Sequence, residues 1–333
     1  MVSNYRVLIG DCRDTLKTLP DQSVNTCVTS PPYFGLRDYG QENQIGLEET
    51  PDEYVAALVA VFREVRRVLR DDGTVWVNLG DSYAGSWGAQ GKRETPGEIS
   101  RNSIRNHPKR ARNTGSIRQA GLKPKDLIGI PWMVAFALQA DGWYLRQDII
   151  WHKPNPMPES VQDRCTKSHE YIFLLSKSAR YYYDSEAIKE PSVEPRGPGN
   201  VKPVRELPCE RPGDNANIRG SLHNIGARET RNKRSVWTVP TRPYAGAHFA
   251  TFPPELIKPC ILAGCPEGGT VLDIFGGSGT TAGVSVGNGR DAVICELNPD
   301  YAELIPGRVK EVSAPYLERR AAEKQIDWLE VIA

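Results

Sequence analysis

Residues 270–281 read TVLDIFGGSGTT, a short apolar run followed by a glycine-rich turn and two threonines. The run is typical of a buried β-strand, and the glycines allow a tight turn into a helix. Because glycine lacks a Cβ, such a turn can approach a ligand closely, and the helix N-terminus favours negative charge. The stretch has neither the Gly-Lys-Ser/Thr of a P-loop nor full GxGxxG spacing, so a purely structural turn explains it equally well on its own.

A carboxylate follows this turn at the spacing expected of a nucleoside site. Residues 291–296, DAVICE, read as the next strand, and Glu296 ends it, 20 residues after Gly276. A carboxylate there can accept two hydrogen bonds from a ribose diol. The turn and Glu296 together therefore favour a cofactor that contains a nucleoside.

The rest of the chain alternates strand and helix patterns, which indicates a mainly parallel, doubly wound α/β sheet. The expected strands are residues 5–9, 24–29, 74–79, 143–151, 170–176, 270–275 and 291–296. The expected helices are residues 14–19, 50–70, 130–142, 252–265, 282–289 and 314–333, with a further helix beginning near Pro299. Two polar segments without apolar periodicity, residues 84–125 and 185–247, interrupt this pattern where insertions would reach a large partner.

The first polar segment is strongly basic. Residues 84–125 contain ten Lys or Arg and two acids, a net charge of +8, which leaves −7 for the remainder of a chain whose total is +1. A basic segment on an acidic body predicts contact with a polyanion such as nucleic acid, and a solvated loop is the alternative. The residues expected to contact DNA here are Arg93, Arg101, Arg105, Lys109, Arg110, Arg112 and Arg118.

Other features of the sequence limit the compartment. Without a run of about 18 apolar residues, no membrane span is expected. The N-terminus, MVSNYRVLIGDC, lacks the pattern of a signal peptide. The seven scattered cysteines form no CxxC pair, which argues against a disulfide framework or a zinc site. We therefore expect a cytoplasmic protein.

A second strand ends in an unusual way. Residues 29–33 read TSPPY, and the consecutive Pro31 and Pro32 fix φ and remove N–H donors, so this backbone offers only carbonyls. Ser30 Oγ and the Pro31 carbonyl can both accept hydrogen bonds from an amine, and Tyr33 offers a ring on which a base can stack. Taken alone, a rigid turn that ends the strand explains these residues as well.

Several motifs together resemble those of the S-adenosylmethionine-dependent DNA amino-methyltransferases. TSPPY comes first, a variable polar region lies in the middle, and DIFGGSGTT and ELNPDY (296–301) come last. This order is typical of the beta group of that family. Further similar stretches are IGDC (9–12), RCTKSHEYIFLLSKS (164–178), RSVWTVP (234–240) and HFATFPPELI (248–257). One departure is Ile274, where the family usually has proline, although isoleucine still fits a buried strand.

The resemblance implies a circularly permuted, Rossmann-like class I methyltransferase fold, with a seven-stranded sheet that contains one antiparallel strand. It divides the chain into a catalytic half (1–184, with the basic loop 84–125), a target-recognition region (185–247) and a cofactor-binding half (248–333). Double-stranded DNA is the implied substrate. A homodimer and a cognate restriction endonuclease are further expectations that come with the resemblance.

The resemblance also assigns site residues, with Glu296 at the ribose and Asp11 beside the adenine. An aspartate at position 11 would equally cap the helix expected at 14–19. The implied catalytic residues are Ser30, Pro31, Pro32 and Tyr33. The implied S-adenosylmethionine-binding residues are Asp11, Cys12, His248, Phe249, Phe252, Asp273, Phe275, Gly276, Gly277, Ser278, Gly279, Thr280, Glu296 and Asn298. In the target region, where arginine can contact phosphates or guanine edges, the expected DNA contacts are Arg219, Arg228, Arg231 and Arg234.

The expected reaction is methylation of an exocyclic amine on a base flipped out of the duplex. Related enzymes that act on cytosine N4 mostly carry Ser at the first motif position, and those that act on adenine mostly carry Asp, so Ser30 favours cytosine N4. Adenine N6 stays an alternative, as does a catalytically silent DNA-binding protein. Cytosine C5 chemistry needs a Pro-Cys nucleophile, and neither Cys209 nor Cys260 follows a strand where TSPPY does. The expected chemistry requires no metal.

Overall fold

The computed structural model describes residues 4–36, 40–41, 43–84, 121–192, 229–242 and 252–332. The chain forms two compact units, Met1–Asp184 with Ser235–Ala333, and Ser185–Arg234. In the second unit lie a 3₁₀ turn (Glu186–Ile188) and the antiparallel pair β6 (Glu190–Pro191) and β7 (Thr230–Arg231). The first unit carries the large sheet and all of the α-helices described below.

The sheet of the first unit has eight strands. They are β1 (Tyr5–Ile9), β2 (Val24–Thr29), β3 (Leu69–Leu79), β4 (Tyr144–His152), β5 (His169–Ser176), β8 (Val236–Thr238), β9 (Thr270–Asp273) and β10 (Asp291–Glu296). Their order is β1-β10-β9-β2-β3-β5-β4-β8. Only β5 runs antiparallel to its neighbours among these described strands. The expected Rossmann-like sheet with one antiparallel strand is confirmed, whereas the expected number of seven strands is wrong.

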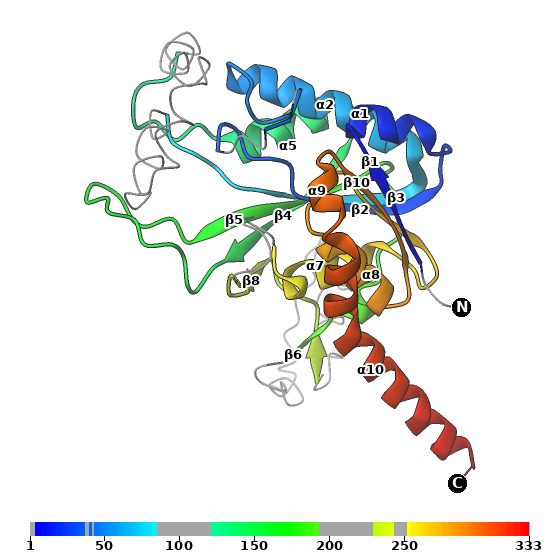
Figure 1. Ribbon diagram of the computed structural model, residues 1–333. Helices are drawn as coiled ribbons and strands as arrows, with labels where there is room; N and C mark the ends of the chain where they lie inside the picture. The colour runs from blue at the N-terminus through cyan, green and yellow to red at the C-terminus, as the bar shows by residue number, and fades with distance from the viewer. Residues whose placement is uncertain are drawn as a thin grey trace, which may run out of the picture. The chain divides into compact units, whose positions relative to one another are not determined.

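Helices cover both faces of the sheet (Figure 1). They are α1 (Cys12–Thr15), α2 (Pro51–Val68), α5 (Ile130–Ala140), α7 (Pro254–Gly264), α8 (Thr280–Gly287), α9 (Pro299–Ala302) and α10 (Ile305–Ile332). In Figure 1, α1, α2 and α5 lie on one face, and α7, α8 and α10 lie on the other. Apolar side chains of α2 and α5 form one core cluster with the central strands, and those of α8 and α10 form another with β10.

Helix α2 begins as its sequence predicts. The Thr50 side chain accepts a hydrogen bond from Glu53 N, and the Glu53 carboxylate accepts one from Thr50 N, which completes a capping box after which Pro51 begins the helix. Its apolar face, which includes the fully buried Leu58 and Phe62, packs in the core. These side chains belong to the same cluster as Cys27 of β2 and Val75 and Val77 of β3, so the helix covers this face of the sheet.

The structure differs from the sequence expectations at three elements. Strand β3 begins at Leu69 rather than residue 74, because Leu69 already pairs with Val24 of β2; the pairing skips residues 70–73 and resumes where Thr74 pairs with Thr26. Helix α10 begins at Ile305 rather than 314 and contains Pro315. The eighth strand, β8, is only three residues long and pairs with β4, too short to give a periodic pattern.

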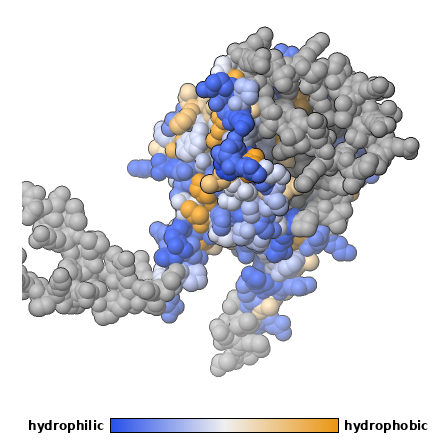
Figure 2. Space-filling view, turned by 90° about the vertical axis from the view of Figure 1, so that its left-hand side faces the viewer, coloured by the Kyte–Doolittle hydropathy of each residue, from blue (hydrophilic) through white to orange (hydrophobic). Residues whose placement is uncertain are grey.

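The surface seen in Figure 2 is mainly hydrophilic where residues are described, with hydrophobic residues in smaller groups between them. Within the described segments, no helix combines the length and the apolar character needed to cross a membrane. Exposed single apolar side chains such as Met157 and Phe136 are ordinary for a folded domain.

Candidate active site

One cavity lies at the edge where parallel strands end. Because β1, β2, β9 and β10 are adjacent and parallel, their carboxyl ends meet, which is the usual position of a ligand site in an open α/β sheet. The predicted site residues that line this cavity are Asp11, Cys12, Ser30, Pro31, Pro32, Tyr33, Phe252, Phe275, Gly276, Gly277, Ser278, Thr280, Glu296 and Asn298. The fold therefore joins the glycine turn and TSPPY, which are about 240 residues apart in the chain.

The glycine turn is packed tightly against β10. Gly276 N donates to Cys295 O at 2.9 Å, and a Cβ on Gly276 would lie 2.0 Å from Ile294 Cγ2. Gly277 and Gly279 have φ of +51° and +89°, a left-handed region that L side chains rarely adopt. Gly276 thus lets the turn lie this close to β10, and Gly277 and Gly279 let the backbone adopt the turn.

Glu296 faces the cavity with both carboxylate oxygens held. Oε2 accepts a hydrogen bond from Gly277 N at 2.7 Å, and Oε1 accepts one from Asn298 N at 2.8 Å. Burial raises the pKa of Glu296 to about 7, although these N–H groups favour the charged form. Since each oxygen keeps a lone pair, the carboxylate can accept from the two hydroxyls of a diol.

Two buried hydroxyls of the lining have no partner among the described residues. They are Ser278 Oγ and Thr280 Oγ1, at the start of α8. Buried polar groups are normally hydrogen-bonded, so these atoms indicate a polar ligand. Together with Glu296, they fit S-adenosylmethionine, whose amino acid end is polar and whose ribose carries a diol.

Asp273 lies beneath the cavity rather than in its lining. Its carboxylate is 1% exposed and accepts hydrogen bonds from Thr29 Oγ1 (2.7 Å), Thr281 Oγ1 (2.6 Å) and Phe275 N (3.1 Å). Burial raises the pKa of this carboxyl, and the three donors oppose that rise. Asp273 therefore ties the end of β2 to the glycine turn instead of facing a ligand, and Gly279 is likewise absent from the lining.

Asp11 both caps a helix and lines the cavity. Its Oδ1 accepts from Arg13 N at 2.8 Å at the start of α1, and its carboxylate pairs with the Arg13 guanidinium. Burial alone would raise the pKa of Asp11, but the hydrogen bonds from Arg13 outweigh it and lower that pKa. Beside it, burial raises the pKa of Cys12 to about 12, so the thiol stays neutral.

The carbonyls of TSPPY are not equally available. Pro32 O accepts a hydrogen bond from Tyr54 Oη of α2 at 2.8 Å. Among the described residues, Pro31 O accepts none. The carbonyl predicted to face an amine is therefore the one that the fold leaves unused.

Tyr33 is held by residues that the sequence reasoning missed. Its hydroxyl donates to Glu170 Oε2 at 2.6 Å, and a Cβ on Gly80 would lie 2.4 Å from its ring. Burial and the negative charge of Glu170 raise the pKa of Tyr33 well above its usual range. Asn78 bridges this group to Ser30, with its Oδ1 3.5 Å from Ser30 Oγ. Stacking of a base on Tyr33 stays a prediction.

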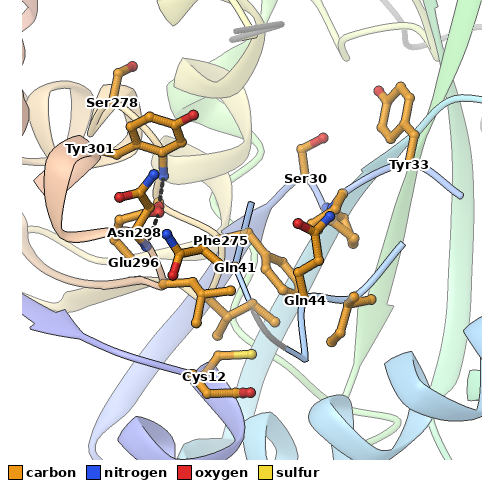
Figure 3. A pocket seen from close by; sticks show the side chains of 18 of the residues that line it. Cys12, Ser30, Tyr33, Gln41, Gln44, Phe275, Ser278, Glu296, Asn298 and Tyr301 are labelled. Atoms are coloured by element: carbon orange, nitrogen blue, oxygen red, sulfur yellow. Dashed lines mark hydrogen bonds between the residues drawn. The ribbon is translucent and has the colours of Figure 1, made fainter. Parts of the chain in front are cut away.

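Several lining residues were also not predicted. In Figure 3, Tyr301 lies on the same side as Glu296, Gln41 lies towards Glu296, and Gln44 lies towards Ser30. Tyr301 belongs to the ELNPDY stretch, whereas the glutamines come from a polar loop without a pattern. The unpredicted lining residues are Gly10, Leu36, Gln41, Asn43, Gln44, Ile45, Ile274, Leu297 and Tyr301.

Two of the predicted DNA contacts are engaged within the second unit. Arg231 Nε and Arg234 Nε lie 2.8 Å and 2.6 Å from Glu190 Oε1. Both guanidinium groups thus contact a carboxylate, and base reading by them stays a prediction. The predicted site residues outside the described part of the chain are Arg93, Arg101, Arg105, Lys109, Arg110, Arg112, Arg118, Arg219, Arg228, His248 and Phe249.

Cys260 is not placed to act as the nucleophile that cytosine C5 methylation needs. Cys260 is 1% exposed inside α7, where its thiol lies 3.9 Å from Leu256 O, and it does not line the cavity. It packs as a small buried residue. Cys209, the other candidate, lies outside the described residues.

Comparisons with known proteins show the family of the chain. The DNA methylase family model for N6 and N4 methyltransferases matches residues 24–306. The type II methyltransferase M.Cfr9I of Citrobacter freundii is 47% identical over 301 residues, which are 90% of this chain and 86% of that protein.

Two solved structures share the fold. The PvuII DNA methyltransferase, described as cytosine-N4-specific, superposes with a TM-score of 0.59 at 17% identity, over 96% of this chain and 94% of that one. A Thermus thermophilus protein complexed with S-adenosyl-L-methionine superposes with a TM-score of 0.56 at 23% identity, over 93% and 94%. With a family model that matches most of its length, the chain belongs to the N6/N4 DNA methylase family and is a DNA methyltransferase.

Proposed function

We propose that this enzyme transfers a methyl group from S-adenosylmethionine to the exocyclic N4 amine of cytosine in duplex DNA. The observation that carries the proposal is the shared cavity. Ser30 and the unused Pro31 carbonyl line the same space as Glu296, Ser278 and the glycine turn. An amine held by the first pair is thereby brought to a cofactor held by the second group.

The chain contributes position and hydrogen bonding to this reaction. The amine of a base is a poor nucleophile because its lone pair is delocalised into the ring. Ser30 Oγ and Pro31 O would accept hydrogen bonds from its two N–H groups and draw the nitrogen towards a tetrahedral geometry. The bound cofactor would supply an activated methyl group. A bond from its carbon to the amine nitrogen would form as the carbon–sulfur bond breaks, with that bond's electrons left on sulfur, and an amine proton would pass to water.

The cofactor would be held by the opposite side of the cavity. Glu296 would accept the ribose hydroxyls, and the unpartnered hydroxyls of Ser278 and Thr280 would meet the polar amino acid end. Asp11 and Cys12 would lie towards the adenine. Asp273, which does not reach the cavity, would keep the glycine turn joined to the end of β2.

Cytosine is the preferred base because Ser30 occupies the first position of the motif. Adenine N6 is the second candidate, since the matching family model covers both N6 and N4 methylation and a serine can accept from either amine. The fold itself is one that a cytosine-N4-specific enzyme uses.

Recognition of the DNA is assigned to the polar segments. The +8 segment at 84–125 would neutralise phosphates, and the region 185–247 would read the target sequence. A cognate restriction endonuclease and a homodimer are the further partners that we propose.

The test is methylation of unmodified duplex DNA with labelled cofactor, followed by mass spectrometry of the nucleosides. We expect N4-methylcytosine, and N6-methyladenine as the sole product would refute the base assignment. Ser30→Ala should lose turnover while it keeps cofactor and DNA affinity. Ser23→Ala, which removes an exposed serine outside the cavity, is the matched control.

A further inference from the structure

A cluster of hydrogen-bonded side chains lies directly behind Ser30 and Tyr33. It consists of Asn78 near the carboxyl end of β3, Glu170 at the start of β5 and Lys153 just after β4. Asn78 is 4% exposed, and the Lys153–Glu170 ion pair is largely buried. A buried polar cluster that contacts the TSPPY motif from behind is placed to control how that motif presents its atoms.

The orientation of the Asn78 amide is set by its neighbours. Its Nδ2 lies 3.2 Å from Glu170 Oε2 and 3.1 Å from Tyr171 O, which are both acceptors. The amide nitrogen must therefore face them. Asn78 Oδ1 then faces the opposite way, 3.5 Å from Ser30 Oγ and 3.4 Å from Tyr33 Oη.

The Tyr33 hydroxyl donates its single proton to Glu170. Its oxygen is 2.6 Å from Glu170 Oε2, a charge-assisted hydrogen bond that is much shorter than its 3.4 Å approach to Asn78. Lys153 pairs with the other oxygen, Glu170 Oε1, which leaves Oε2 to accept from Tyr33 and Asn78. Asn78 Oδ1 carries no proton, so in its 3.5 Å contact with Ser30 Oγ the serine is the donor.

We propose that Asn78, held by Glu170, is a positioning residue that turns the Ser30 hydroxyl proton away from the cavity. A serine hydroxyl can donate or accept, and a free rotor would do both. If Ser30 donated to the substrate amine, its proton would occupy the lone pair that must attack the methyl group. With the proton given to Asn78, Ser30 Oγ presents only lone pairs to the amine.

This inference rests on the proposed amine methylation, and a double-mutant cycle separates the two. Asn78→Leu and Glu170→Gln should each reduce single-turnover methylation roughly tenfold, the effect of a hydrogen bond of about 1.4 kcal/mol, without changing cofactor or DNA affinity. If Asn78 acts through Ser30, Asn78→Leu should cost no further rate in a Ser30→Ala background.

The control is Asn25→Leu, which removes a hydrogen bond to Thr270 N on the neighbouring strand pair without contacting Ser30. Any effect of Asn25→Leu on the single-turnover rate should be the same factor with and without Ser30→Ala. Urea midpoints identify any variant that fails to fold, and Glu170→Gln provides the milder second probe of the same cluster.

The outcomes are distinct. Full activity of Ser30→Ala would reject the acceptor role in the proposed function. Suppose that Ser30→Ala loses activity, and that Asn78→Leu and Glu170→Gln each reduce the rate by the same factor with and without Ser30→Ala. That result would overturn only the positioning role. Non-additive effects with Ser30, and multiplicative effects for Asn25, would support it.

Discussion

Substitution of Gly276 with alanine should force the glycine turn away from β10. The new Cβ would lie 2.0 Å from Ile294 Cγ2 and 3.3 Å from Cys295 O. Ile294 is fully buried, so it has no solvent-filled space into which to rotate. To regain van der Waals contact near 3.4 Å, turn and strand must separate by roughly 1.4 Å.

That separation has two measurable effects. Overpacking of a buried site should lower the free energy of unfolding by about 1–3 kcal/mol. It should also move Gly277 N away from Glu296 Oε2, now 2.7 Å apart, so that the carboxylate no longer has its set orientation. We expect S-adenosylmethionine affinity to fall at least tenfold, on the order of 1.4 kcal/mol.

Urea denaturation at constant m-value measures the first effect, and calorimetric titration with S-adenosylmethionine measures the second. Gly307→Ala is the matched control, because no atom lies within 4 Å of its added Cβ and it sits in α10. It should be neutral or gain up to about 1 kcal/mol from helix propensity. A Gly276→Ala protein with wild-type midpoint and affinity would refute the packing argument.

Three further results are expected. The pKa of Glu296 is about 7 in the empty site, and a bound diol and cation favour its ionised form. Cofactor binding at pH 7 should therefore release up to about half a proton, and cofactor affinity should fall as the pH drops below 7. Calorimetry in buffers of different ionisation enthalpy measures this, and Glu296→Gln should abolish it. Thr29→Val removes a donor from buried Asp273 and should cost about 1–3 kcal/mol in urea denaturation; no change would mean that the carboxyl finds another partner. Replacement of Arg110 and Arg112 with glutamine should reduce the slope of log affinity for DNA against log salt by up to about 2, and an unchanged slope would place the phosphate contacts elsewhere.

Much of the sheet followed from local pattern. The strands at 5–9, 24–29 and 291–296 begin and end where the sequence predicts, because short apolar runs bounded by polar residues or turns need no distant partner to be recognised. The capping box at Thr50 was equally readable, since both of its partners lie within one helical turn.

The expectations that failed depend on partners far along the chain. Asp71-Asp72-Gly73 looks like a turn that ends before the strand, but it lies inside β3, as an irregularity between the pairs Leu69–Val24 and Thr74–Thr26. Strand β8 exists because Trp237 pairs beside Trp151 in β4, and three residues carry no period of their own. In both cases the bounds of the strand are set by pairing with a distant segment, which a local pattern does not show.

By itself, the sequence determined that a glycine turn, a carboxylate and TSPPY would occur in this chain, because each is a local motif with its own chemistry. Only the tertiary structure decided which of their polar atoms remain available. It commits Pro32 O to Tyr54 and buries Asp273 under the turn, while Pro31 O stays unused among the described residues. It also places Glu170 against Asn78, 92 residues away, behind Ser30. Hydrogen bonds between distant segments form only when the sheet assembles, so a local sequence pattern does not predict which polar atoms they use.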